Sequence, residues 1–273
     1  MSEVKESIVD KLRVKIFETR PGMGAAAAYD ISEKLKELLL KKDFVNMIFA
    51  AAPSQNEFLA FLSHRQGIDW ERVNAFHMDE YVGLEKNARG SFGQFLNERI
   101  FGKVPFNKVY YINGNALDLA VECNRYAGLL HQLPPDIVCM GIGENTHIAF
   151  NDPHVADFND LKLVKAVTLD EKSRRQQVHD KCFSGIEEVP VSAITLTVPA
   201  LLESKYIFCI VPGNTKALAV YHTLYEEVQE GYPSTILRKH INATLYLDNA
   251  SASIIRLKGD LPSLREYRNN ERS

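Results

Sequence analysis

The chain has 273 residues, of which 45% are hydrophobic and 25% are charged, and this composition excludes wholesale disorder. The formal net charge of −3 gives nucleic acid or an anionic membrane surface no electrostatic attraction to this protein, so we expect neither as a partner. An anionic ligand would have to be held by local hydrogen-bond donors.

The N-terminus and the cysteines bear on the compartment. Residues 1–12 are polar where a signal peptide would be apolar, and no stretch approaches the roughly 20 uninterrupted apolar residues of a membrane span. Four cysteines lie far apart without CxxC spacing, which predicts isolated thiols: Cys123, Cys139, Cys182 and Cys209. These features predict a cytoplasmic protein.

Short apolar runs alternate with amphipathic stretches along the chain. After a strand-like Val14–Phe17, apolar residues recur at helical spacing in 31–39, 119–130 and 217–224. Runs typical of buried parallel strands lie at Val45–Ala52, Val73–Met78, Ile137–Met140, Ile194–Val198 and Tyr206–Val211. This alternation predicts an α/β fold, a mostly parallel Rossmann-like sheet with helices on both faces. No repeat or linker divides the chain, so we expect residues 1–273 to form a single domain.

Ligands of such sheets bind beyond the carboxyl ends of the strands, so the residues after each run are candidates for a site. The first run leads into Ala52-Pro53-Ser54-Gln55-Asn56 and a helix. Ser54 is expected to cap this helix, whose free backbone N–H groups would suit a phosphate. A helix cap without a binding role is the alternative.

The second run is followed by two adjacent carboxylates, Asp79 and Glu80. Neighbouring residues of a strand point to opposite faces, so one carboxylate can face the crevice while the other braces the loop. Desolvation in a crevice raises the pKa of a carboxyl group and suits it to act as a general base. A solvated turn is the alternative for this pair.

The third and fourth strand ends carry further candidates. His147 follows Gly141 and Gly143, with Asn145 before it and Asp152 after it, which is the pattern of a proton carrier whose tautomer is fixed by its neighbours. After the last run, Lys216 stands in the first turn of a helix, where the helix dipole disfavours a cation. A bound anion would explain that lysine.

These segments together resemble the glucosamine-6-phosphate deaminase (isomerase) family. Met78–Leu84 reads MDEYVGL without a change, and His147–Asn151 reads HIAFN. Gly213-x-x-Lys216-Ala217 matches GxxKA, and Ser234–Leu237 is similar to a late ASILQ-type helix start. The likeness runs in order from about residue 22 to about residue 255.

In this family an amino sugar phosphate such as glucosamine 6-phosphate is opened, isomerised and hydrolysed to fructose 6-phosphate and ammonia. The resemblance implies that Asp79 takes the C2 proton and returns it to C1, and that His147 carries the proton for ring opening. It implies no metal and no other cofactor, since enolisation needs only positioned acid–base groups. It also makes a homo-oligomer possible, although no residue pattern indicates an interface.

The chain departs from the family around the histidine. Asn145 and Thr146 stand where the family has Asp-Gly, and an amide orients an imidazole but cannot stabilise imidazolium by charge. Asp152 replaces the Glu of the family's FNEP and is one methylene shorter. We expect ring opening to be tuned differently here.

The phosphate-binding residues differ more. The family's TGGTP loop is replaced by residues 52–56, so the phosphate needs other donors, for which we consider Ser54, Gln55, Gly143 and Lys216. Arg174, beside Arg175 on the helical stretch after Asp170, is the nearest candidate for the family's phosphate arginine. A solvated helix face is the alternative for both arginines.

Two other functions compete with the deaminase. A 6-phosphogluconolactonase-type hydrolase shares the glycine–histidine strand end, but that family resembles GHTASLFP and DER where this chain has HIAFNDP and DEY. A non-catalytic sugar-phosphate sensor would explain Asn145 and the lost phosphate loop. Glucosamine and galactosamine phosphates differ at one stereocentre, and no motif distinguishes them.

Overall fold

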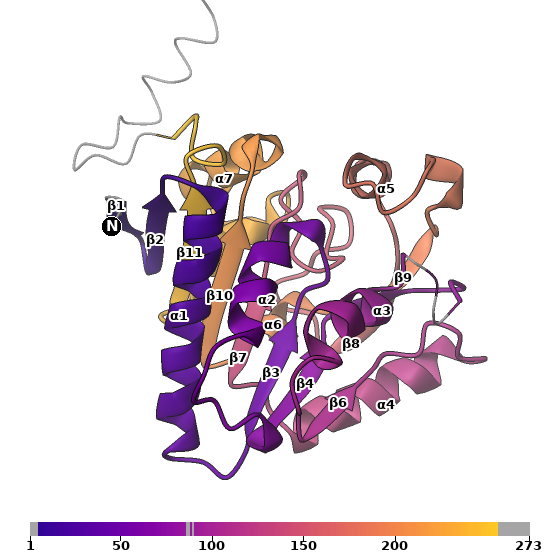
Figure 1. Cartoon of the computed structure of the whole chain (residues 1–273). Coiled ribbons are helices and arrows are strands. Elements are labelled where there is room, and N and C mark those ends of the chain that lie inside the picture. The colour runs from indigo at the N-terminus through magenta and orange to yellow at the C-terminus, as the bar shows by residue number, and fades with distance from the viewer. Residues whose placement is uncertain (1–4, 86–87, 89, 256–273) are drawn as a thin grey trace, which may run out of the picture.

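The computed structural model describes residues 5–85, 88 and 90–255, so residues 1–4 and 256–273 of the expected single domain lie outside the described part. Its centre is an eight-stranded sheet (Figure 1). The order is β1 (Lys5–Val9), β2 (Leu12–Phe17), β11 (Ala243–Asp248), β10 (Tyr206–Val211), β7 (Ile137–Met140), β3 (Val45–Phe49), β4 (Val73–His77) and β6 (Lys108–Tyr110). Every neighbouring pair is parallel except β1 and β2. The predicted mostly parallel α/β sheet is confirmed.

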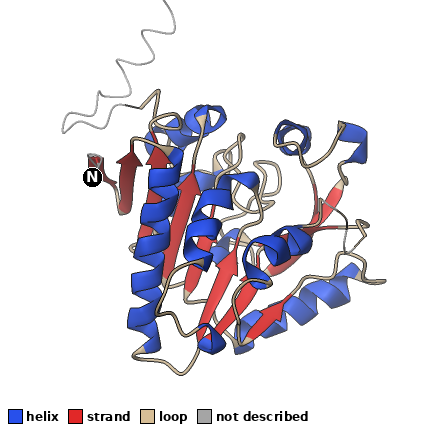
Figure 2. Ribbon diagram, viewed as in Figure 1, coloured by secondary structure: helices blue, strands red, loops and turns tan. Residues whose placement is uncertain are grey.

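Helices cover both faces of this sheet (Figure 2). One face packs against α1 (Arg20–Leu39), α2 (Asn56–Ser63) and α3 (Phe92–Leu96), and the other against α4 (Leu119–Gln132), α6 (Val198–Leu202) and α7 (Ala217–Tyr225). Side chains alternate between the two cores along the strands. In β10, for example, Ile207 and Cys209 enter one core while Phe208 and Ile210 enter the other.

A second, antiparallel sheet has the order β5 (Asp79–Tyr81), β9 (Ser192–Leu196) and β8 (Val164–Thr168). The prediction that Ile194–Val198 is a strand of the parallel sheet is therefore wrong, because its strand residues form β9. This strand is almost fully buried, and burial on both faces gives it the apolar composition of a parallel strand. The chain leaves β4 at His77 and enters β5 at Asp79, so the small sheet fixes the position of Asp79 just beyond the end of β4.

The remaining elements are α5 (Glu171–His179) and short turns of helix. These turns are η1 (Pro53–Gln55), η2 (Trp70–Arg72), η3 (Asn97–Phe101), η4 (Ile186–Glu188), η5 (Asn214–Lys216) and η6 (Pro233–Lys239). Within the described ranges, the structure contains no helix long and apolar enough to cross a bilayer.

Residues 22–28, which are all glycine or alanine except Met23, lie in α1 and permit another helix to pack closely. Thr19 caps this helix by accepting a hydrogen bond from the backbone N–H of Gly22 at 3.2 Å. A Cβ atom at Gly24 would lie 2.8 Å from Cβ of Glu57 and 3.0 Å from the backbone nitrogen of Phe58. Glycine at this position therefore sets the approach of α2 to α1.

We predict that Gly24→Ala lowers the free energy of unfolding by about 1–3 kcal/mol, because the methyl group meets the α2 backbone. Gly128→Ala on α4 is the matched control, since a Cβ atom there meets nothing within 4 Å. The control should raise stability by about 0.5–1 kcal/mol through helix propensity. Denaturant titration of both variants measures the difference, and equal effects would contradict the packing argument.

Candidate active site

A cavity of about 60 Å³ lies at the carboxyl ends of β3, β4, β7 and β10. The strand order reverses between β3 and β7, and open parallel sheets bind ligands at this kind of switch point. Five of the predicted catalytic and binding residues line the cavity, namely Ser54, Asp79, Gly143, His147 and Lys216. Segments far apart in the sequence therefore meet at one place.

Asp79 and Glu80 have opposite roles. Glu80 accepts hydrogen bonds from the backbone N–H groups of Tyr81, Phe92 and Gly93 and from the hydroxyl of Ser91, at 2.9–3.1 Å. Asp79 is only 6% exposed and lines the cavity, and its carboxylate makes no hydrogen bond to any described residue. Burial, and secondarily the neighbouring charge of Glu80, raises the pKa of Asp79 well above its ordinary value.

The imidazole of His147 is oriented through one ring nitrogen. Nδ1 lies 2.6 Å from Oδ1 of Asn145, 2.8 Å from Oγ of Ser173 and 3.1 Å from Oδ1 of Asp152. An amide oxygen and a carboxylate can only accept, so we assign the proton of the neutral ring to Nδ1. Nε2 then keeps its lone pair for a ligand in the cavity.

The carboxylate of Asp152 contacts His147 and both of its other Nδ1 partners. This carboxylate is 0% exposed and accepts hydrogen bonds from Nδ2 of Asn145 at 3.0 Å, from the hydroxyl of Ser173, and from the backbone N–H of Asp170 at 3.0 Å. Burial alone would raise the pKa of Asp152. The hydrogen bond and charge of His147, with hydrogen bonds from Ser173 and Asn145, reverse that effect and hold the pKa below its usual range.

The backbone around His147 is shaped to the ring. A Cβ atom at Gly143 would lie 2.1 Å from the imidazole, so this glycine makes room for the histidine as well as lining the cavity. Thr146 and Ala149 adopt left-handed backbone, with φ of 70° and 49°. Such strain in residues other than glycine gathers at functional sites.

Lys216 is the cation of the cavity. It is 5% exposed and ends η5, and its side-chain ammonium group forms no ion pair or hydrogen bond with a described residue. Burial lowers its pKa, an effect that the charges of Asp180 and Glu144 oppose. A buried cation without a partner is unfavourable, and a bound anion would remove that cost.

Three predicted binding residues lie differently from expectation. Ser54 lines the cavity, but it does not cap α2, because it lies inside η1 and its hydroxyl accepts a hydrogen bond from Nε2 of Gln55 at 3.1 Å. Gln55 is buried behind the cavity and also donates to the carbonyl of Ile210. Arg174 does not line the cavity, because its guanidinium donates to the carbonyls of Ile186 and Val189.

Helix α5 contributes residues that the sequence did not single out. Ser173 contacts His147 and Asp152, and Gln176 and Gln177 line the cavity. Of the two arginines for which a solvated helix face was the alternative, Arg175 is exposed and Arg174 is half-buried. The buried residues of this helix, at 173, 176 and 177, are all polar, so no hydrophobic periodicity in the sequence marked its inner face.

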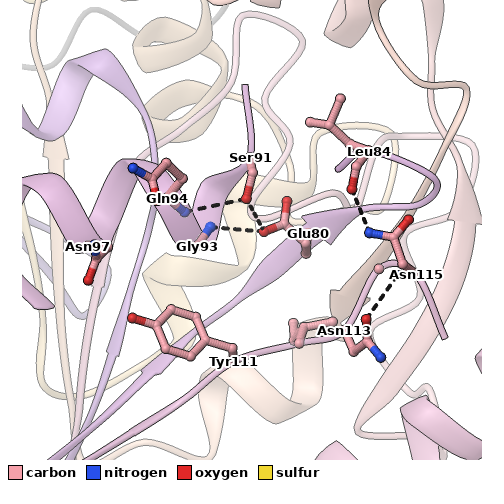
Figure 3. A pocket seen from close by; sticks show the side chains of 11 residues that line it. Glu80, Leu84, Ser91, Gly93, Gln94, Asn97, Tyr111, Asn113 and Asn115 are labelled. Atoms are coloured by element: carbon pink, nitrogen blue, oxygen red, sulfur yellow. Dashed lines mark hydrogen bonds between the residues drawn. The ribbon is translucent and has the colours of Figure 1, made fainter. Parts of the chain in front are cut away.

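A larger cavity of about 610 Å³ is lined by Glu80, the neighbour of Asp79 on β5 (Figure 3). Amide and tyrosine side chains such as Asn97, Tyr111, Asn113 and Asn115 line it, together with the braced Glu80. None of the described residues that line it is Lys, Arg or His. We therefore place an anionic ligand in the smaller cavity despite the difference in volume. No cluster of His, Cys, Asp and Glu suited to a metal occurs among the described residues.

Comparison with known proteins places the chain among enzymes. Residues 18–246 match the family described as glucosamine-6-phosphate isomerases/6-phosphogluconolactonase. The chain belongs to this family. Glucosamine-6-phosphate deaminases of Bacillus cytotoxicus and Bacillus thuringiensis are 36% identical over 187 residues, covering 68% of this chain and 70% of each relative.

Solved structures of family members share the fold. A monomeric glucosamine-6-phosphate deaminase superimposes with a TM-score of 0.82 at 29% identity, over 88% of this chain and 99% of that one. A 6-phosphogluconolactonase of Thermotoga maritima gives 0.69 at 21% identity, over 86% and 98%. The family resemblance of the sequence motifs is confirmed.

The raised pKa of Asp79 predicts that ionisation of this group lowers the stability of the folded protein at high pH. A carboxyl group whose pKa is raised by folding contributes stability below its unfolded pKa and loses it as the pH rises through the folded value. Asp79→Asn removes this titration, so we expect its melting temperature to exceed that of the wild type at high pH, with a difference that shrinks as the pH falls. Thermal melts across a pH series measure it. Parallel curves for the two proteins would contradict the burial of an ionising group at this position.

Proposed function

We propose that this protein is a glucosamine-6-phosphate deaminase, which converts glucosamine 6-phosphate and water to fructose 6-phosphate and ammonia. The observation that carries the proposal is one cavity lined by an unpaired buried carboxylate, an oriented imidazole and an unpaired ammonium group, Asp79, His147 and Lys216. The relatives named glucosamine-6-phosphate deaminase, at 36% identity, support it.

Each of these groups suits one step. Nε2 of His147 accepts the proton of the C1 hydroxyl group and gives it to the ring oxygen, which opens the ring. Asp152 stabilises the imidazolium formed between these two transfers. Asp79 then takes the C2 proton and delivers it to C1 through an enolamine, as its raised pKa makes it a stronger base. The protonated amino group gives a proton to O1, water adds to the iminium carbon C2, and a proton of that water passes to the nitrogen, so that ammonia leaves and C2 becomes a carbonyl. Lys216 binds the phosphate, with Ser54 as a further donor.

The volume of the cavity requires a movement before this substrate binds. About 60 Å³ is well below the ~300–1,000 Å³ of typical ligand pockets. Gln176 and Gln177 cover the cavity from α5, whereas the glycine-containing strand end below it is part of the sheet scaffold. We infer that α5 moves outward to admit the sugar phosphate.

Three alternatives are tested together with this proposal. The 6-phosphogluconolactonase-type hydrolase rests on fold likeness at 21% identity, below the 29% of the deaminase structure. A sensor would have no use for a buried base such as Asp79. Galactosamine 6-phosphate is the remaining substrate alternative, since it differs from glucosamine 6-phosphate at one stereocentre.

We predict that the purified protein releases ammonia and fructose 6-phosphate from glucosamine 6-phosphate, and that Asp79→Asn lowers kcat by at least ~10²–10⁴-fold, the usual contribution of a general base. Coupled assays for both products measure this. Asp43→Asn, an exposed carboxylate preceding β3 at the opposite end of the strand, is the matched control and should leave the rate unchanged.

Hydrolysis of 6-phosphogluconolactone without deamination would overturn the proposal in favour of the lactonase. Thermal stabilisation by glucosamine 6-phosphate without turnover would overturn it in favour of the sensor. Turnover of galactosamine 6-phosphate alone would reassign the substrate.

A further inference from the structure

Four polar groups of the cavity have no partner in the described chain. They are the carboxylate of Asp79, Nε2 of His147, the ammonium group of Lys216 and the side-chain amide of Gln177. The proposed function uses the first three as base, ring-opening group and phosphate anchor. It leaves the amide of Gln177 without a role.

In the arrangement of this structure, the contacts of α5 hold Gln177 against the cavity. Ser173 ties α5 to His147, and Gln176 ties it to the strand end, because its Oε1 accepts from the backbone N–H of Glu144 at 2.8 Å. Nε2 of Gln176 donates to Asp180, so this neighbouring amide has partners for both of its ends. Gln177, one residue further on, is only 7% exposed, and neither the oxygen nor the nitrogen of its side-chain amide forms a hydrogen bond with a described residue.

This contrast between two adjacent amides indicates a ligand. The Gln177 side chain is largely buried, and no described residue supplies a hydrogen bond to its amide, so this amide is free to bond a molecule in the cavity. Gln177 lines the cavity, and a bound molecule is placed to be that partner. The residue lies on the cover of the cavity, and its hydrogen bond would form only when α5 lies over the substrate.

We propose that Gln177 is a specificity-determining residue that hydrogen-bonds a hydroxyl group of the sugar. A neutral amide both donates and accepts, as a hydroxyl group does, whereas Lys216 is the charged group suited to the phosphate. The inference rests on the proposed function and adds to it a residue that reads the hydroxyl pattern of the hexose. A site built to bond a hydroxyl rejects the analogue that lacks it, because its polar group is then left unpaired.

The test compares Gln177→Met with the wild type. Methionine keeps the length and flexibility of the side chain and loses the amide. We expect KM for glucosamine 6-phosphate to rise roughly tenfold while kcat stays within about twofold, as befits a bond made equally in ground and transition states. Arg175→Met, on the exposed side of the same helix, is the matched control and should change neither constant.

Deoxy analogues identify the contact. The 3-deoxy and 4-deoxy forms of glucosamine 6-phosphate are assayed with both proteins. When the missing hydroxyl is the one that Gln177 binds, the KM of the wild type should be roughly tenfold higher for the analogue than for glucosamine 6-phosphate. The KM of Gln177→Met should be the same for both substrates. This wild-type measurement also stands if the variant does not fold.

An unchanged KM for Gln177→Met would overturn the inference, and so would equal KM values of the wild type for all three substrates. A wild type that does not turn over glucosamine 6-phosphate would instead overturn the proposed function. The two failures are therefore distinguishable.

Discussion

The site depends on one buried carboxylate, that of Asp152. It is fully enclosed, and it accepts from Asn145, from Ser173 and from the backbone of Asp170 while lying 3.1 Å from the imidazole of His147. These contacts join the strand end below the cavity to α5 above it. The same carboxylate therefore both orients the imidazole of His147 and holds the start of α5 in place. A buried charge without these donors would be unfavourable.

This arrangement explains the residue at 145. An amide there donates to Asp152 through Nδ2 at 3.0 Å and accepts from His147 through Oδ1 at 2.6 Å. A second carboxylate could accept from the histidine, but it would repel Asp152 and lose the donated bond. The sequence suggested that an imidazolium here would lack charge stabilisation. The structure supplies that charge from Asp152 and leaves Asn145 to hold both groups in place.

The sequence predicted the fold and part of the site because both depend on local patterns. Apolar runs marked the strands, and the rule that ligands bind at their carboxyl ends brought Asp79, His147 and Lys216 to one cavity. What it missed depends on contacts distant in sequence. Arg174 turns to backbone carbonyls, β9 pairs outside the main sheet, and Ser173 reaches His147 from 26 residues away. No composition or spacing rule encodes such partners.

Transfer of the C2 proton shows whether Asp79 acts on a bound sugar phosphate beside His147. Glucosamine 6-phosphate deuterated at C2 is converted in ordinary water, and the fructose 6-phosphate is examined by NMR. We expect deuterium at C1 of the product, because a single shielded carboxyl group carries it between adjacent carbons, and no such product from Asp79→Asn. Undiminished transfer of the label by that variant would show that another group carries the proton.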